Sequence, residues 1–248
     1  MGPLDLLILV AALAVAGLAK GLAGMGLPLI ATPVLAGVFG PRAAVVIISI
    51  PILVANTLLL MHGWKRISGV LVEIWPMLLA GAVGTAIGVS LLAQLDQRLF
   101  AGLISLLVVL FLFRGERVLG DDPDARRVKA TGPLIGLLGG TLQGSTSIAS
   151  PLIGSYFHAR RVTPKDFVVI LAALFQLNSI VQIGGFLAYG LLTPELLALG
   201  IAGLVPTLLA LMAGIELRGR IPEHRFRQVI VVLLVASVAN LLWRTFAG

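Results

Sequence analysis

Long apolar runs separated by short polar loops recur along the whole chain. Six of these runs are uninterrupted and each has about twenty residues; they cover roughly 43–61, 71–93, 97–113, 166–188, 195–214 and 227–246. At a rise of about 1.5 Å per residue, a helix of this length crosses the ~30 Å apolar core of a bilayer. The short alternating segments of a membrane β-barrel are absent. The pattern therefore predicts an all-α integral membrane protein.

Two further apolar segments are broken by glycine, proline and polar residues. The first covers 3–40 and contains "KGLAGMGLPLIATP", and the second covers 131–157 and contains "QGSTSIASP". The second is too short for two full spans, so it predicts a re-entrant hairpin, which enters and leaves the membrane on one side. The first is long enough for a hairpin or for two full spans.

The two broken segments resemble each other, which indicates an internal repeat. "ATPVLAGVF" (31–39) resembles "ASPLIGSYF" (149–157) at an offset of 118, which pairs Gly21 with Gly139 and Gly26 with Gly144. Farther along, Asn56 pairs with Asn178 at an offset of 122, and "LDQRLF" (95–100) matches "IPEHRF" (221–226) at an offset of 126. We therefore expect one membrane transport domain, 1–248. It divides into a first repeat at 1–113, a cytoplasmic linker at 114–130 and a second repeat at 131–248, each repeat a broken element followed by three transmembrane helices.

The loop charges favour an inverted arrangement of the repeats. The sequence has 18 lysines and arginines, which leaves 17 once Lys20 in the first broken segment is set aside. If each broken segment crossed the membrane once, these 17 would divide eight to nine. If each broken segment enters and returns on one side, only Arg42, Arg98 and Arg244 lie outside, and the other fourteen lysines and arginines lie inside. The positive-inside rule favours the second arrangement, which inverts the repeats and makes both termini periplasmic.

The tips of the broken segments are the predicted binding site. Gly24 and Gly26 permit a tight turn, and Pro28 suits the first turn of a returning helix. In the second copy, the hydroxyl residues at 145–147 are of the type that caps a helix start. Each tip would then present a helix N-terminus near the membrane midplane, where free N–H groups and the helix dipole favour an anion. The alternative is that these glycines and hydroxyls only pack a turn.

Polar residues inside the helices extend this prediction. Asn56 and Asn178 occupy matching positions, either as interhelical hydrogen bonds or as part of the site. Gln182 can share the face of Asn178, and Lys20 either contacts a ligand or extends to the membrane surface. The candidate substrate-binding residues are Lys20, Gly24, Met25, Gly26, Asn56, Gln143, Gly144, Ser145, Thr146, Ser147, Asn178 and Gln182.

The composition excludes several other function classes. The net charge of +7 sits in short loops, so it reflects membrane topology and predicts no nucleic-acid partner. The sequence has no cysteine, Walker motif, histidine cluster or catalytic triad pattern, so we expect no enzyme, no cofactor and no metal. No aspartate or glutamate lies in the middle of a span. A coupling proton or ion therefore has no carboxylate to which it can be assigned.

Three stretches resemble the sulfite exporter TauE/SafE family of membrane permeases. They are "GLAKGLAGMGLPLIATPVLAGVFGPRAAV" (17–45), "VANTLLLMHGWKRI" (54–67) and "GLLGGTLQGSTSIASPLIGSYF" (136–157). Family members typically carry a Gly-x-Gly-Gly-Gly motif in both halves. Here the first copy reads Gly-Met-Gly-Leu-Pro from Gly24, and the second reads Gly-Ser-Thr-Ser from Gly144.

The resemblance implies a secondary transporter in the bacterial inner membrane that exports a small sulfur-containing anion. Sulfite and organosulfonates such as sulfoacetate are the expected substrates, bound between the two re-entrant tips. The alternatives are a channel-like pore for a small anion or neutral solute, and a scaffold for another membrane complex. The sequence leaves the oligomeric state open.

Overall fold

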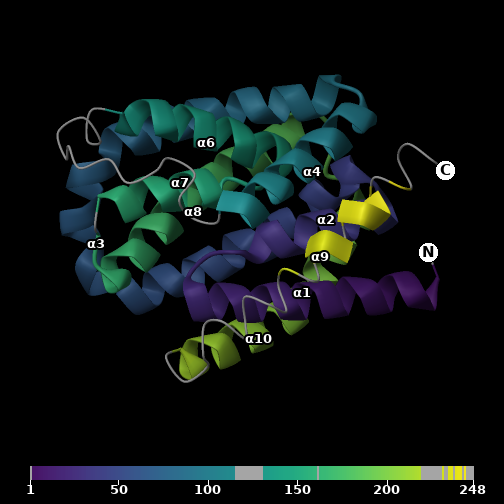
Figure 1. Ribbon diagram of the computed structural model, residues 1–248, viewed down its shortest axis with the longest axis horizontal. Coiled ribbons are helices and arrows are strands. Elements are labelled where there is room, and N and C mark those ends of the chain that lie inside the picture. Colours follow the sequence, from purple (N-terminus) through teal and green to yellow (C-terminus); the bar gives the residue numbers. More distant parts are fainter. Residues whose placement is uncertain are drawn as a thin grey trace.

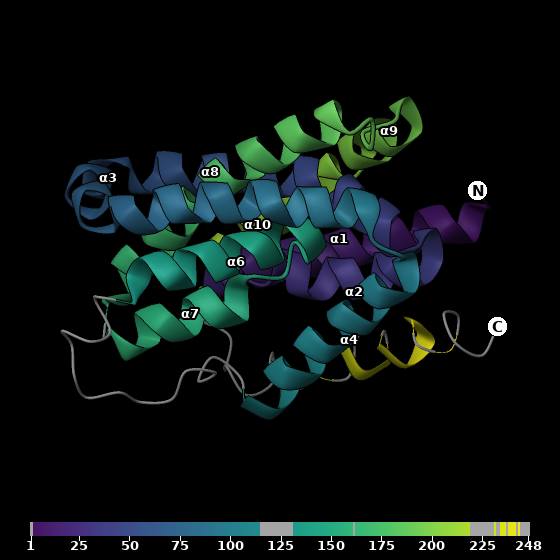
Figure 2. The ribbon, with the colours of Figure 1, turned by 90° about the horizontal axis from the view of Figure 1, so that it is seen from above.

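The computed structural model describes residues 2–114, 131–160 and 162–218, together with 231, 234–236, 238–241 and 243. Its principal elements are α1 (Pro3–Ala23), α2 (Leu27–Phe39), α3 (Pro41–Gln94), α4 (Gln97–Arg114), α6 (Gly132–Thr146), α7 (Ser150–Ala159), α8 (Pro164–Ala188), α9 (Pro194–Ala202) and α10 (Leu204–Leu217). The helices α1, α3, α6 and α8 follow the long axis of the molecule (Figure 1), and α4 crosses to one side of this bundle (Figure 2). The described chain contains helices and no strands, which confirms the all-α prediction for this part.

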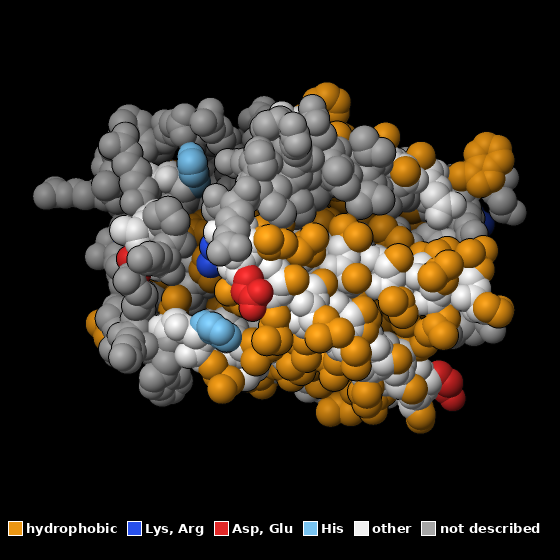
Figure 3. Space-filling view, turned by 90° about the horizontal axis from the view of Figure 1, so that it is seen from below, with side chains coloured by type: hydrophobic (Ala, Val, Ile, Leu, Met, Phe, Trp, Pro, Cys, Tyr) orange, Lys and Arg blue, Asp and Glu red, His pale blue; other side chains and the backbone are white. Residues whose placement is uncertain are grey.

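Within the described residues, five segments are long and apolar enough to cross a membrane: Pro3–Ala23, Pro41–Gly63, Ile74–Gln94, Asp166–Ala188 and Pro194–Leu217. The last four agree with predicted spans to within three residues at each end. The predicted span at 97–113 corresponds to α4, whose apolar stretch, Gln97–Leu110, is shorter. The predicted span at 227–246 lies mostly outside the described residues, as does the linker. Large apolar side chains cover much of one face of the molecule (Figure 3), as expected for contact with lipid.

Helix α3 contains two spans that run antiparallel to each other. Its first leg is Pro41–Gly63 and its second leg is Ile74–Gln94. Arg42, at the start of the first leg, donates hydrogen bonds of 3.0 Å to the carbonyl oxygens of Leu92 and Leu95. These contacts join the start of the first leg to the end of the second, so the chain reverses direction within α3.

Both broken segments form two helices joined by a short turn. In the first, α1 ends at Ala23, and Gly24 and Gly26 adopt positive φ angles of 80° and 103°. In the second, α6 ends at Thr146, and Ser147 adopts a φ of 61°. The helix α7 returns beside α6. This is seen from Gly139 of α6, where a β-carbon would lie 2.8 Å from the side chain of Ile153 in α7.

The breaks correspond at an offset of 123, so the predicted offset of 118 is wrong here. The left-handed residues Gly24 and Ser147 are 123 positions apart, and so are Leu27 and Ser150, which begin the returning helices. Each start is followed by a proline in the first turn of the helix. The sequence comparison instead paired Pro33, which lies inside α2, with the proline at the start of α7. Counted from the two breaks, Gly21 aligns with Gly144 and not with Gly139.

Two glycine seams hold the broken segments against distant spans. In the first seam, a β-carbon on Gly17 or Gly21 of α1 would collide with carbonyl oxygens of α10, those of Thr207 and Leu211. In the second seam, β-carbons on Gly140 and Gly144 of α6 would collide with carbonyl oxygens of the second leg, those of Gly81 and Thr85. The contacted residues on the two spans are 126 positions apart. Each broken segment thus packs its first helix against a span from the other half of the chain.

Candidate functional site

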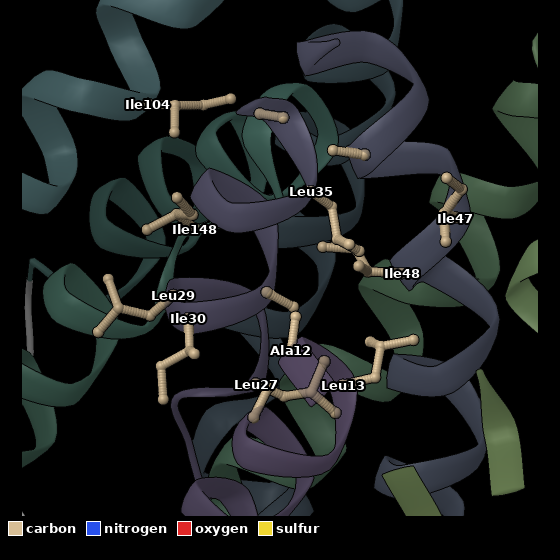
Figure 4. Close-up of a cluster of buried hydrophobic side chains, with 14 of the residues drawn as sticks. Ala12, Leu13, Leu27, Leu29, Ile30, Leu35, Ile47, Ile48, Ile104 and Ile148 are labelled. Atoms are coloured by element: carbon tan, nitrogen blue, oxygen red, sulfur yellow. The ribbon is translucent and has the colours of Figure 1, made fainter. Parts of the chain in front are cut away.

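The two tips extend past each other in the middle of the molecule. Met25, in the first tip, belongs to the apolar cluster of α6, α7 and α8, and a β-carbon on Gly154 would lie 3.3 Å from its sulfur. Ile148, at the equivalent place in the second tip, joins the cluster around α1, α2 and the first leg, which also contains Leu29 and Ile30 (Figure 4). Each tip therefore inserts an apolar side chain into the core beside the other. The returning helices α2 and α7 begin two residues after these side chains, at Leu27 and Ser150.

Neither of these first turns carries a side-chain cap. The N-cap residues are Gly26 for α2 and Ala149 for α7, and no side chain hydrogen-bonds to the amides at either helix start. The first N–H groups of a helix have no partner within the helix. Each helix start thus offers backbone donors and the positive end of its helix dipole.

The predicted hydroxyl cap of α7 is wrong. Ser145 and Thr146 lie in the last turn of α6 and donate to the carbonyl oxygens of Thr141 and Leu142, at 2.7 and 2.8 Å. Because α6 remains helical through Thr146, hydroxyl groups there satisfy carbonyls four residues earlier in their own helix. The Thr146 oxygen also accepts a bond from the Ile148 amide, so both side chains stabilise the turn.

Several buried polar side chains around the tips have no hydrogen-bond partner among the described residues. All the side-chain polar atoms of Thr32, Asn56, Gln143, Ser150, Asn178 and Ser179 are in this state, as is one amide oxygen in each of Gln176 and Gln182. A buried polar group without a partner costs about 1–3 kcal/mol. Such groups are rare in proteins, and a cluster of them indicates a place for a polar ligand or for water.

Helix α8 carries four buried residues on one face of this region. Phe175, Asn178, Ser179 and Gln182 follow the spacing i, i+3, i+4 and i+7, which places them on the same side of a helix. We call these residues the α8 polar face. The amide nitrogen of Gln182 donates to the Gln143 carbonyl at 2.8 Å and to the Ser147 hydroxyl at 3.1 Å, so this end of the face contacts the second tip.

The first tip contacts the other end of the α8 polar face. Lys20 is only 2% exposed, and its ammonium nitrogen lies 5.9 Å from the centre of the Phe175 ring. The alternative in which Lys20 extends to the membrane surface is therefore wrong. Gly24 contacts α8 farther toward its start, where a β-carbon would lie 2.7 Å from the Val168 side chain. The structure thus brings Lys20, Asn178, Gln182 and Gln143 along one short stretch of α8.

The predicted asparagine pair lies on the first leg and on α8, and a β-carbon on Gly81 of the second leg would lie 3.1 Å from the Asn178 amide oxygen. Thr57 follows Asn56 and accepts a 3.0 Å hydrogen bond from Gln176, while Gly63 lies against Val169. As residue numbers rise along the first leg, the contacted numbers fall along α8, so these helices run antiparallel. Asn56 and Asn178 are both buried, and neither makes an interhelical hydrogen bond within the described chain.

Several polar residues of this region were absent from the predicted candidate list, among them Ser150, Thr32 and Arg218. Ser150 is the first residue of α7 and Thr32 is the sixth of α2, and the offset of 118 paired them with each other. Arg218 follows α10 and donates three bonds of 2.7–3.1 Å to the carbonyl oxygens of Gly21 and Leu22. In the sequence it is one of many loop arginines, so no pattern distinguished it. Within the described residues, no group of three or more histidines or carboxylates could hold a metal ion.

The chain matches one family model over most of its length. The model is that of the sulfite exporter TauE/SafE family, and it matches residues 9–241. No protein of curated function and no solved structure matches the chain.

Proposed function

Because the chain belongs to the sulfite exporter TauE/SafE family, we propose that it is a secondary transporter that exports sulfite or an organosulfonate such as sulfoacetate. The family suggests a multi-pass membrane transporter of sulfur-containing anions, which agrees with the five apolar spans. We place the substrate between the two tips. The binding groups are the uncapped amides of α2 and α7, together with Lys20, Asn56, Gln143, Asn178 and Gln182.

The observation that carries this proposal is the set of buried polar atoms without partners around the tips. A small oxyanion presents several acceptor oxygens at once, and the helix starts and side-chain amides of this region supply donors. The described part of the region contains one buried cation, Lys20, and the buried side chains there include no carboxylate. These donors favour an anion over a cation.

The proposed mechanism is alternating access between two inverted repeats in a bacterial inner membrane. Support comes from the first leg and α8, which occupy equivalent places in the two halves and run antiparallel. The seams give further support, because α1 packs its glycines against α10 in the same way as α6 packs its glycines against the second leg. Rocking of one half against the other would then open the site to each side in turn.

A pair of substitutions separates a binding role from a structural role. The Asn178→Leu variant removes amide atoms that have no described protein partner, so we expect its thermal stability to be unchanged or higher. It should lose the stabilisation by sulfite, which in the wild type reaches about 2.7 kcal/mol at a hundred times Kd. Ser105→Ala, which removes a buried hydroxyl of α4, is the matched control and should keep that stabilisation. Full sulfite stabilisation in Asn178→Leu would reject this site.

Transport measurements separate a carrier from a channel-like pore. In proteoliposomes loaded with sulfite, a carrier shows saturable uptake that is accelerated by substrate on the opposite side. A pore shows neither property, so unsaturable flux without acceleration would favour the channel alternative. The scaffold alternative predicts that no sulfur-containing anion is transported or stabilises the purified protein.

The proposed topology has its own test. A reporter enzyme that is active only in the periplasm should be active when fused after Gly248. A second reporter, active only in the cytoplasm, is fused at the same position. Activity of this second reporter would reject the inverted arrangement.

A further inference from the structure

Lys20 and Gln143 occupy equivalent positions in the two tips but differ in charge. Each lies four residues before the left-handed residue that ends its helix, Gly24 or Ser147. Both side chains are buried, with exposed fractions of 2% and 1%. The same structural position thus holds a cation in the first tip and a neutral amide in the second.

These two residues lie at opposite ends of the α8 polar face. Lys20 contacts Phe175 at one end, and the Gln143 carbonyl accepts a bond from Gln182 at the other. Gln182 lies seven positions after Phe175, which corresponds to about 10 Å along the helix axis. Asn178 and Ser179, whose polar atoms have no described partner, lie between them. A small anion that contacts this face is therefore near a full positive charge on one side only.

The charge of Lys20 is not paired with an opposite charge in the described chain, where its ammonium group lies near the Phe175 ring. Its ammonium group makes no ion pair, and the described carboxylates, such as Asp5, Asp166 and Glu216, lie near helix ends. A charged group inside a membrane protein is costly unless it is paired, and such groups mark the paths of ions and substrates. The Gln143 amide is likewise without a partner, but it carries no charge. The binding of an anion would compensate Lys20 much more than Gln143.

We propose that this exchange of lysine for glutamine makes the two entrances of the site unequal. Substrate anions then bind with higher affinity from the end where α8 begins, which is the Lys20 end, than from the end where α8 finishes. The inference rests on the proposed transport function and adds a specific determinant of its sidedness. The difference in affinity should be about tenfold. The extra free energy of a hydrogen bond to a charged group, compared with one to a neutral amide, corresponds to about a factor of ten in the dissociation constant.

The test is the half-saturation concentration of sulfite, measured from each side in oriented vesicles. The chain has no cysteine, so a Tyr189→Cys label at the exposed end of α8 reports which side faces outward, through its reaction with an impermeant maleimide. We expect the wild type to half-saturate at an about tenfold lower concentration from the side opposite Tyr189. Lys20→Gln should remove the difference, and the exchange variant Lys20→Gln/Gln143→Lys should reverse it.

Two further results decide the case. Lys20→Arg keeps the charge and should keep the asymmetry, so this variant and Lys20→Gln test the idea even if the exchange variant does not fold. Equal half-saturation from both sides in the wild type, or an asymmetry that persists in Lys20→Gln, would overturn the inference while leaving the transport function intact. Absence of sulfur-anion flux in every variant, including the wild type, would instead reject the transport function together with the inference.

Discussion

The two tips have the same plan but differ in the residues that make the turn and that hold the last carbonyls of the preceding helix. The first turns through two left-handed glycines, Gly24 and Gly26, whereas the second turns through Ser147, a left-handed residue that is not glycine. The last carbonyls of α1 are held by the cation of Arg218, and those of α6 by the neutral amide of Gln182.

This contrast separates what the architecture requires from what each tip adds. The glycine seams are the same in both halves, since close approach of two helix backbones leaves no room for a β-carbon at any of these positions. The caps and turns differ, because either a cation or an amide can satisfy a helix C-terminus. Charge is therefore concentrated at the first tip, and neutral hydrogen bonding at the second.

The largest expected effect comes from breaking the seams. Gly21→Ala and Gly144→Ala each place a β-carbon against a backbone carbonyl, so we expect both to lower the stability by roughly 1–3 kcal/mol. The measurement is thermal unfolding in detergent. Gly102→Ala and Gly184→Ala are matched controls, because nothing lies within 4 Å of the new atom, and they should be neutral or stabilising. A seam that tolerates alanine would break the equivalence of the two halves.

The turn residues should give the next largest effect and distinguish the tips. Gly24→Ala forces alanine into a left-handed conformation and crowds Val168, so a loss of about 1–2 kcal/mol is expected. Ser147→Gly relieves the same strain but removes the oxygen that accepts from Gln182, so its stability should change by less than about 1 kcal/mol. Equal losses in the two unfolding measurements would contradict the different chemistry proposed for the turns.

Replacing the caps should give a smaller effect that depends on salt at one tip only. Arg218→Met and Gln182→Met each remove hydrogen bonds to helix carbonyls, at an expected cost of about 1 kcal/mol. Arg218 is charged and partly exposed, so added salt should reduce its contribution. The contribution of Gln182 should not change with salt. Chemical denaturation in urea at low and high salt measures both, and the same salt dependence at the two caps would contradict the assignment.

The smallest effect is expected where the first leg crosses α8. Thr57→Val removes the acceptor of the Gln176 amide, and because Thr57 is exposed we expect a loss of about 0.5 kcal/mol. A double-mutant cycle with Gln176→Met should give a coupling energy of similar size. Zero coupling would mean that this hydrogen bond does not connect the two halves.

Much of the helical plan could be predicted from the sequence, because apolar length and glycine–proline breaks are local signals. Predicted spans such as 166–188 agree with the structure, and the break at Gly24–Gly26 was placed correctly. The grouping of Gln182 with Asn178 also followed from helical spacing alone. These features depend only on residues close together in the chain.

The errors arose where one residue type suits two structural positions. Proline can begin a helix or lie inside one, so the proline at 33 was paired with the wrong partner and the offset was five residues too short. Hydroxyl residues can cap a helix start or bond within a last turn, so Ser145 and Thr146 were given the wrong role. Arg218 was missed because its partner carbonyls are distant in sequence.

The seam between α1 and α10 also constrains how the protein is made. Gly21 receives its hydrogen bonds from a residue 197 positions later in the chain. At a synthesis rate of about 5–20 residues per second, α1 leaves the ribosome roughly 10–40 s before its packing partner exists. During that interval its buried lysine and its glycine face lack their final neighbours. The first helix therefore reaches the membrane well before the segment that its glycines pack against.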